Sequence, residues 1–339
     1  MRSQSNLTIN GKRVGAKPGE TLIDAALGGW MVIPHDCRSG QCESCRVTVV
    51  SGDVDDQGTA VGRTVLACQA RVRSDAEIRF DELPAPVKRA GVLSQLNLLA
   101  PEILEVVIAL DKPLDIRPGQ YVRVKFAGYP AREYSPTSRL LGPAHSGEVV
   151  LHIRILPDGL VSSQLGTAIK VGHRLHLQGP FGTAFLRQDD GPLVLVSGGA
   201  GWAPIWSLAR AARETQRHRH LVVIAGSRTP ENLYMRPALE WLIDDGVRDV
   251  FAIVESGAVH PVLSGRPHHY LPLLGMEDTV YVAGPAGLVD RVRTRAQWAA
   301  GQFFADPFLP SGDKPSIGDY LRRLAGAKGW RSAFASLPN

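Results

Sequence analysis

The chain has 339 residues, of which 44% are hydrophobic and 21% charged, a composition typical of a folded globular protein and not of a disordered one. Its length exceeds that of one ordinary core, so two or three domains are expected. The net charge of +5 is modest, and the sequence shows no basic stripe with a recognition motif, which argues against nucleic-acid binding.

The N-terminal segment MRSQSNLTIN lacks the apolar stretch of a secretory signal. The longest uncharged run, GPLVLVSGGAGWAPIWSLA, is interrupted by glycines and prolines, which favours a strand, a glycine loop and a helix start over a membrane span. We therefore expect a cytoplasmic protein that does not span a membrane.

Residues 1–84 have the pattern of a small module of strands around one helix. Two short alternating segments flank Asn10-Gly11, a dipeptide typical of hairpin turns. Thr21 is expected to cap a helix over TLIDAALGG, with Asp24 three residues later as in a capping box. Later strands are expected at RVTVV and AEIRF, and together these elements predict a β-grasp module.

Four cysteines, Cys37, Cys42, Cys45 and Cys68, are the candidate metal ligands. In a cytoplasmic chain, four cysteines favour metal binding or redox chemistry over disulfides. A C-x4-C-x2-C run followed by a distant cysteine is the plant-type 2Fe–2S pattern, and Gly40 lets backbone amides approach the sulfurs. The alternatives are a zinc site, which usually pairs two C-x2-C motifs, and four unrelated core thiols.

Residues 5–83 resemble a plant-type ferredoxin domain in these motifs. The family often has glycine or another small residue directly after the second cysteine, whereas this chain has Glu43. A carboxylate there is expected to lower the potential of the cluster and to mark a docking surface.

The proline-bearing segment DELPAPVKRAG (81–91) is expected to be a linker. From 92 to 187, short alternating segments separated by turn residues predict an antiparallel β-barrel. Beyond Gly191, strands alternate with helices, which predicts a parallel sheet that binds ligands at the carboxyl ends of its strands. In VSGGAGWAP the glycines would let the backbone approach a phosphate at a helix N-terminus, although they could equally form a plain tight turn.

Residues 92–308 resemble the ferredoxin–NADP reductase superfamily. The resemblance implies that Arg132 pairs with the flavin diphosphate, that Tyr134 stacks on the isoalloxazine ring, and that Ser135 bonds near the reactive ring nitrogen. Without the resemblance, Tyr134 could be an ordinary core aromatic. The resemblance also implies a second flavin-binding segment, formed by Ile153, Ile155, Gly159, Leu160, Val161 and Ser162. The nicotinamide nucleotide is expected to bind at Gly199, Ala200, Gly201, Gly284 and Pro285.

Arg228 is a candidate for the adenosine end of the nucleotide, or else a solvated surface arginine. In FFADPFLP, Asp306 and Phe308 match an acidic residue of the family and an aromatic residue beside the flavin ring. The family's cysteine in its C-G-P segment is Ala283 here, which puts the placement of the nicotinamide in doubt. A basic tail with apolar residues at helical spacing follows, and it is expected to pack on its own domain or to dock a partner.

The domain order is similar to that of the reductases of bacterial aromatic-ring oxygenases. Four segments are expected: a 2Fe–2S domain (1–84), an FAD-binding β-barrel (85–189), an NAD(P)H-binding α/β domain (190–310) and a helical tail (311–339). The resemblance implies an enzyme of aromatic-compound breakdown that passes electrons from NADH through FAD and the cluster to an oxygenase or a separate ferredoxin.

NADH is expected over NADPH, because the sequence shows no dense basic cluster near Arg228. We also expect a monomer. The alternatives are a reductase for a deoxysugar dehydratase or a diiron monooxygenase, and a non-catalytic redox sensor or carrier, which the loss of the family cysteine at Ala283 slightly favours.

Overall fold

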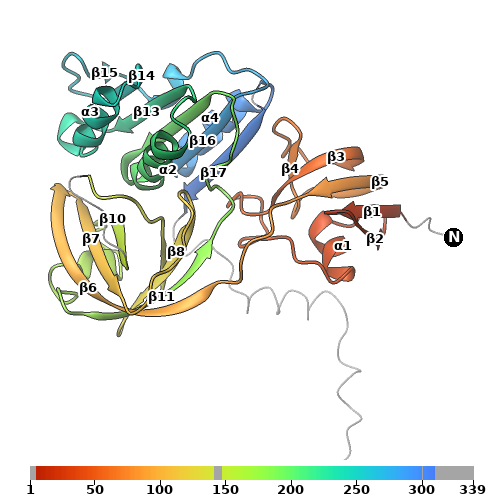
Figure 1. Ribbon diagram of the computed structural model, residues 1–339, viewed down its shortest axis with the longest axis horizontal. Coiled ribbons are helices and arrows are strands. Elements are labelled where there is room, and N and C mark those ends of the chain that lie inside the picture. The colour runs from red at the N-terminus through yellow and green to blue at the C-terminus, as the bar shows by residue number, and fades with distance from the viewer. Residues whose placement is uncertain (1–4, 141–146, 300, 310–339) are drawn as a thin grey trace, which may run out of the picture. The chain divides into compact units, whose positions relative to one another are not determined.

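The computed structural model describes residues 5–140, 147–299 and 301–309 (Figure 1). The tail expected at 311–339 lies outside the described residues, and one compact unit extends as far as Phe308. Within the described residues the strands form three separate sheets, and no helix is long and apolar enough to cross a membrane.

The first sheet has the order β2-β1-β5-β3-β4, and helix α1 (Leu22–Gly28) packs on it; together they are called the cluster module. Asn10 and Gly11 both have positive φ (47° and 81°), which confirms the predicted tight hairpin turn. Thr21 caps α1 by accepting a hydrogen bond from the Asp24 amide at 3.2 Å. The strands are β1 (Ser5–Ile9), β2 (Lys12–Ala16), β3 (Arg46–Asp55), β4 (Thr64–Leu66) and β5 (Arg71–Arg79).

The second sheet, called the flavin sheet, has the order β10-β7-β6-β11-β8-β9, and all its neighbouring strands are antiparallel. A bridge between Thr137, just beyond β9, and Val150 in β10 brings the two ends of the sheet together, as the predicted barrel requires. The strands are β6 (Val87–Ala100), β7 (Ile103–Leu110), β8 (Tyr121–Phe126), β9 (Arg132–Tyr134), β10 (Glu148–Arg154) and β11 (Arg174–Phe181).

The linker predicted over residues 81–91 is wrong in its second half. Strand β6 already begins at Val87, and Val87 to Val92 pair with β11 from Gly179 to Arg174. The last proline of the segment is Pro86, so no proline interrupts the hydrogen bonds between β6 and β11. The segment between β5 and β6 is correspondingly shorter than expected.

The third sheet, called the nucleotide sheet, is parallel throughout, in the order β15-β14-β13-β12-β16-β17. It consists of β12 (Leu193–Gly198), β13 (Leu221–Ser227), β14 (Asp249–Val254), β15 (Leu263–Ser264), β16 (Thr279–Pro285) and β17 (Gln302–Phe308). Its helices are α2 (Trp202–Thr215), α3 (Arg236–Asp244) and α4 (Ala286–Ala296), and short 3-10 turns lie at Ser162–Gln164, Gly199–Gly201, Pro230–Asn232 and Pro267–Tyr270.

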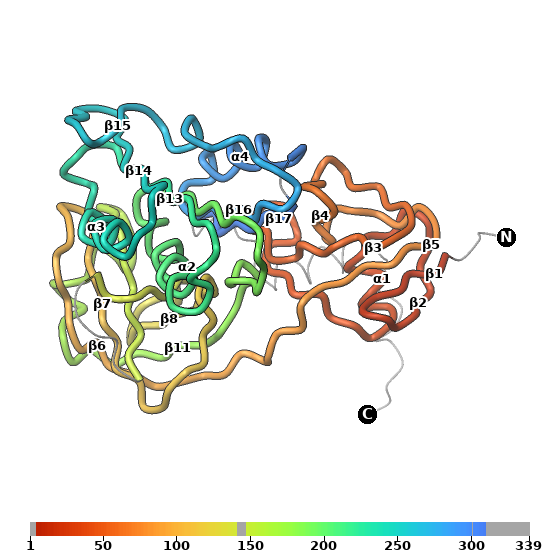
Figure 2. Tube along the Cα trace, turned by 45° about the horizontal axis from the view of Figure 1, so that its top comes forward, coloured from red at the N-terminus to blue at the C-terminus, as the bar shows by residue number. Residues whose placement is uncertain are grey.

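Both faces of the nucleotide sheet are buried, as its nearly continuous apolar strands predict. Leu193 and Leu195 of β12 point into the core shared with α2 and α3, whereas Val194 and Val196 point into the core shared with α4. Figure 2 shows α2 and α4 on opposite sides of β16. The change of side between α2 and α4 leaves the carboxyl ends of β12 and β16 open to a ligand.

Candidate functional site

The cysteine loop between α1 and β3 brings the predicted ligands together as two pairs of thiols. The amides of Cys42 and Ser39 point at the Cys37 sulfur at 3.4 and 3.3 Å, and the Cys37 amide points at the Cys42 sulfur at 3.5 Å. Gly40 has a φ of 79°, so the loop needs a residue without a side chain at that position. Cys68 lies in the turn after β4, and the Gln69 side-chain Nε2 donates a hydrogen bond to its sulfur at 3.3 Å.

The paired thiols differ in acidity. The Cys42 thiol donates to Cys37 and lowers the pKa of Cys37 to about 4, while the pKa of Cys42 is raised. In the same way, Cys45 lowers the pKa of Cys68 to about 7. One sulfur of each pair is therefore readily available as the thiolate that binds iron.

Among the described residues, no group of three or more Cys, His, Asp or Glu side chains is arranged around one metal ion. Two thiol pairs fit the demands of a 2Fe–2S cluster, in which each iron takes two cysteines, better than those of a single zinc ion.

The residues expected to face the flavin gather on and after β9. The Arg132 guanidinium donates only to the neighbouring Ala131 carbonyl, at 2.8 Å, and has no acidic partner among the described residues. Its remaining donors suit a diphosphate, which accepts from the guanidinium in a bidentate fashion. Burial raises the pKa of Tyr134 to about 12, and the buried hydroxyl of Thr137 has no hydrogen-bond partner in the described part of the chain. A free guanidinium, an aromatic ring and an unsatisfied hydroxyl in one segment fit a flavin dinucleotide.

The second predicted flavin segment is built by a tight turn after β10. Ser162 Oγ accepts from the Leu156 amide at 3.1 Å, and a Cβ on Gly159 would lie 2.4 Å from that oxygen. The turn therefore needs glycine at Gly159. Of the other residues of this segment, Ile153 and Val161 are buried, Ile155 is partly buried and Leu160 is exposed.

Ser135 and Asp306 meet although they are far apart in the sequence. The Ser135 hydroxyl, just beyond β9, donates to Asp306 Oδ2 in β17. The sequence assigned both residues to the reaction from different motifs without predicting that they touch. Phe308, two residues beyond Asp306, is 39% exposed and is thus not an ordinary core residue of the described chain.

Removal of water from the Asp306 carboxyl raises its pKa from 3.8 to about 6, against the opposing effect of the Ser135 hydrogen bond. Because the folded pKa is the higher one, folding suffers no penalty below about pH 3.8 and loses up to about 3 kcal/mol as the pH rises through 6. We expect Asp306→Asn to gain stability relative to the parent between pH 4.5 and pH 7.5. Thermal unfolding of both proteins at the two pH values measures this, and a pH-independent difference would contradict the assignment.

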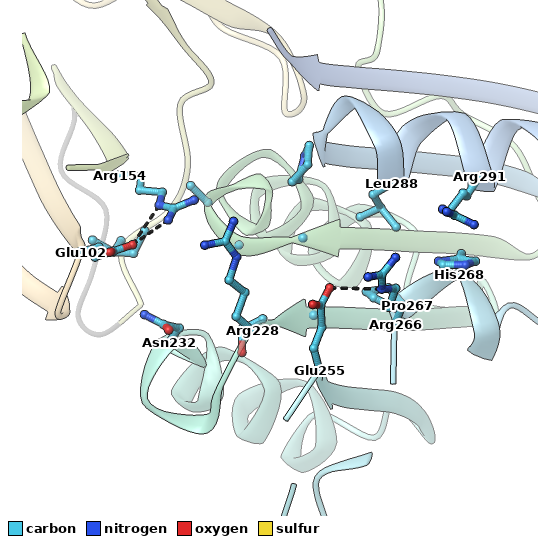
Figure 3. Close-up of a pocket in the computed structure, with 17 residues that line it drawn as sticks. Glu102, Arg154, Arg228, Asn232, Glu255, Arg266, Pro267, His268, Leu288 and Arg291 are labelled. Atoms are coloured by element: carbon cyan, nitrogen blue, oxygen red, sulfur yellow. Dashed lines mark hydrogen bonds and ion pairs between the residues drawn. The ribbon is translucent and has the colours of Figure 1, made fainter. Parts of the chain in front are cut away.

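A cavity of about 460 Å³ opens at the carboxyl ends of the parallel strands (Figure 3). Gly199, Ala200, Arg228 and Pro285 line it, as candidates for the nucleotide site. Gly201 and Gly284 lie directly behind: a Cβ on Gly201 would be 2.6 Å from the Gly284 Cα. The two adjacent turns can approach each other this closely only because both positions are glycine.

In the folded chain Arg228 lies among basic residues that the sequence around it did not predict. Arg154, Arg266 and Arg291 line the same cavity as Arg228, from three other elements. Arg154 pairs with Glu102 at 2.7 Å and Arg266 with Glu255 at 3.4 Å. Figure 3 shows Arg228 extending between these two ion pairs. Arg228 and Arg291 have no acidic partner among the described residues, so they are the charges available to a ligand.

Several residues of the cavity were missed by sequence reasoning. Glu255 directly follows β14, so its place at the carboxyl edge of the sheet could have been predicted. Arg266 and Arg291 carry no such signal. His268 lies in the 3-10 turn Pro267–Tyr270 beside the cavity, where it is 7% exposed and desolvation lowers its pKa.

Comparisons with known proteins agree with this arrangement. Three family profiles match: a 2Fe-2S iron-sulfur cluster binding domain (residues 7–73), an oxidoreductase FAD-binding domain (92–185) and an oxidoreductase NAD-binding domain (195–294). The chain is 30% identical, over 91% of its length and 97% of the relative, to the ferredoxin–NAD(P)+ reductase component of naphthalene 1,2-dioxygenase/salicylate 5-hydroxylase systems from Ralstonia.

A second relative is the xylene/toluene monooxygenase electron transfer component of Pseudomonas putida, at 29% identity over 90% of this chain and 94% of the relative. Among solved structures, an Amycolatopsis cytochrome P450 reductase superposes with a TM-score of 0.64 at 25% identity, covering 90% of this chain and 99% of that one. The two relatives and this solved structure thus each match 90% or 91% of the chain.

Proposed function

Since this chain belongs to the family of NAD(P)H-dependent flavin iron–sulfur reductases, we propose that it is the reductase component of an aromatic-ring oxygenase system. It would pass electrons from NADH to the oxygenase itself or to a separate ferredoxin, as a monomer in the cytoplasm. There, reducing conditions would keep its four free cysteines available for iron. We propose domain boundaries near residues 84, 189 and 310, which fall between the three sheets and beyond the last of them.

The observation that carries the proposal is the direct contact of the flavin sheet with both the cluster module and the nucleotide sheet. Asp36, beside the ligand Cys37, accepts a hydrogen bond from Tyr121 of the flavin sheet at 2.6 Å. Close to Tyr121, since Val122 of β8 pairs with Tyr134 of β9, the Ser135 hydroxyl joins the flavin sheet to Asp306 of the nucleotide sheet. The flavin sheet thus lies between the nucleotide sheet and the cysteine loop in this chain of contacts, the order that electron transfer from NADH through a flavin to a cluster requires.

FAD, when bound, accepts a hydride from NADH and passes its two electrons on singly, which is the chemistry that joins a two-electron donor to a one-electron cluster. The protein's share is binding and orientation. Arg132 would hold the diphosphate, Tyr134 would pack on the ring, and the Ser135 hydroxyl would be oriented by Asp306. Phe308 would cover the ring face until nicotinamide takes its place. Overall, one NADH and two oxidised one-electron acceptors give NAD+, a proton and two reduced acceptors.

The test of this function is NADH-driven reduction of cytochrome c, a one-electron acceptor, by the flavin- and iron-loaded protein. Reduction that needs both cofactors supports the proposal. Oxidation of NADH without reduction of any one-electron acceptor would refute it.

We propose NADH as the preferred donor from the charges in the cavity. Arg228 and Arg291 match the two negative charges of the NADH diphosphate, whereas a 2′-phosphate would bring further negative charge towards Glu255 and Glu102. We expect kcat/KM to favour NADH by about tenfold, a difference of about 1.4 kcal/mol. Glu255→Gln should raise kcat/KM for NADPH and so reduce the preference for NADH. A clear preference of the parent protein for NADPH would contradict this assignment.

A further inference from the structure

Glu43 occupies an unfavourable position in the cysteine loop. It directly follows the ligand Cys42, its φ is 61°, and its side chain is only 2% exposed. This region of backbone conformation favours glycine, and a buried carboxylate has lost its hydration as well. A residue that is disfavoured on both counts is retained only if its carboxylate makes compensating interactions.

Two arginines provide these interactions. Arg46, in β3 of the cluster module, donates from Nε to Glu43 Oε2 at 2.7 Å, and its Nη2 lies 2.6 Å from the same oxygen. Arg293 comes from α4, on the nucleotide sheet, and its Nη2 lies 2.7 Å from Glu43 Oε1. Each carboxylate oxygen thus lies at ion-pair distance from a guanidinium, and Oε1, which has no hydrogen bond within the described residues, is paired with an arginine of the nucleotide sheet's α4. The docking surface expected at Glu43 is therefore occupied by the chain's own α4.

Apolar packing surrounds this ion triad. Val61 of the cluster module is completely buried in the core formed by the nucleotide sheet and α4. The neighbouring Gly62 amide donates to the Gln297 carbonyl, at the end of α4, at 3.5 Å. The Arg46 guanidinium lies 5.8 Å from the ring centroid of Phe303 in β17. The cluster module therefore contacts α4 and β17 through Val61, Gly62 and Arg46 in addition to the Glu43–Arg293 ion pair.

The same loop is attached to the flavin sheet on its other side. Asp36 Oδ2 accepts from the hydroxyls of Tyr121 and Ser44, both at 2.6 Å. The Thr183 hydroxyl, beyond β11, donates to the Ser44 carbonyl at 3.5 Å. The segment that carries three of the four cysteines is thus held between the flavin sheet and α4, in the place where it can receive electrons from a flavin.

We propose that Glu43 and Arg293 are positioning residues for electron transfer within the chain: their ion pair holds the cysteine loop against the flavin sheet. This proposal rests on the proposed function. Each electron that leaves the reduced flavin reduces the cluster, which is reoxidised by a one-electron acceptor, so the overall balance given above is unchanged. The pair takes no part in hydride transfer, because neither residue lines the nucleotide cavity.

Arg293→Leu is the variant that tests the proposal. It leaves the cluster module unaltered and keeps Glu43 paired with Arg46. In the loaded protein we expect NADH-driven reduction of a small dye that accepts directly from the flavin to stay within about twofold. Reduction of cytochrome c through the cluster should fall at least about tenfold, since a misplacement of about 1 Å can cost on the order of a hundredfold in a positioned transfer. Flavin and cluster absorbance should be unchanged.

A second readout needs no electron transfer. Glu82 is exposed in the segment between β5 and β6, and a glutamate-specific protease should cleave there faster once the cluster module is no longer held. Arg293→Lys should restore much of both properties. Asp290→Asn is the matched control, because it removes the other carboxylate that pairs with Arg293, at 2.6 Å, and leaves Glu43 untouched.

The outcomes separate clearly. A selective loss of cytochrome c reduction with faster cleavage in Arg293→Leu, rescue by lysine and no effect of Asp290→Asn support the proposal. Parental cytochrome c reduction and cleavage in Arg293→Leu overturn it, and so does an equal loss of dye and cytochrome c reduction. Failure of the parent protein itself to reduce the dye with NADH would instead refute the proposed function.

Discussion

Cys68→Ser is expected to lose the iron–sulfur cluster while the flavin remains bound. Cys68 is the one proposed ligand outside the Cys37–Cys45 loop, and it forms the second thiol pair with Cys45. Without it, that pair cannot hold its iron. Loss of residues that merely support a metal ligand costs roughly 10–100-fold, so loss of the ligand itself should lower cytochrome c reduction at least about a hundredfold. Iron and sulfide content, visible absorbance and cytochrome c reduction measure the effect.

Gln69→Ala is the matched control for this variant. Its amide donates to the Cys68 sulfur at 3.3 Å but supplies no ligand. The cluster should therefore stay, with an altered reduction potential, because hydrogen bonds to sulfur tune the cluster. A full complement of iron and sulfide in Cys68→Ser would disprove the ligand assignment.

Gly201→Ala is expected to disrupt the nucleotide site. The added methyl group would lie 2.2 Å from the Ala283 carbonyl oxygen and 2.4 Å from its carbon, which are backbone atoms of β16. Backbone cannot rotate away as a side chain can, so the turn after β12 must separate from the end of β16. Overpacking of this kind typically costs about 1–3 kcal/mol of stability. Displacement of the turn should also lower kcat/KM for NADH about a hundredfold.

Gly287→Ala provides the comparison for Gly201. It lies near the start of α4, its Cβ would meet nothing within 4 Å, and alanine favours a helix more than glycine does. Its stability and NADH kinetics should match or exceed those of the parent. Equal behaviour of the two variants in thermal unfolding and NADH kinetics would show that close approach at Gly201 is unimportant.

Local features of the fold could be predicted from the sequence because their causes are local. The positive φ at Asn10-Gly11 and the cap at Thr21 follow from the residues at those positions. The spacing of Cys37, Cys42 and Cys45 predicts that they share one loop. The alternation of apolar residues likewise distinguishes the antiparallel flavin sheet from the parallel nucleotide sheet.

Features that depend on contacts between modules had no comparable signal. Glu43 and Arg293 are separated by most of the chain, so the sequence near either residue does not predict their ion pair. The meeting of Ser135 with Asp306 has the same origin. The four arginines of the cavity likewise come from separate elements, so the residues next to Arg228 in the sequence do not predict that the other three lie near it.

The central claim is that electrons from NADH reach the cluster through the flavin of the same chain. Rapid anaerobic mixing of the loaded protein with NADH, followed at flavin and cluster wavelengths and by electron paramagnetic resonance of frozen samples, tests it directly. We predict that flavin absorbance falls first and that the signal of the reduced cluster follows without any added protein. In Cys68→Ser the flavin should still be reduced. A cluster that stays oxidised while NADH is consumed and the flavin is reduced would contradict the account.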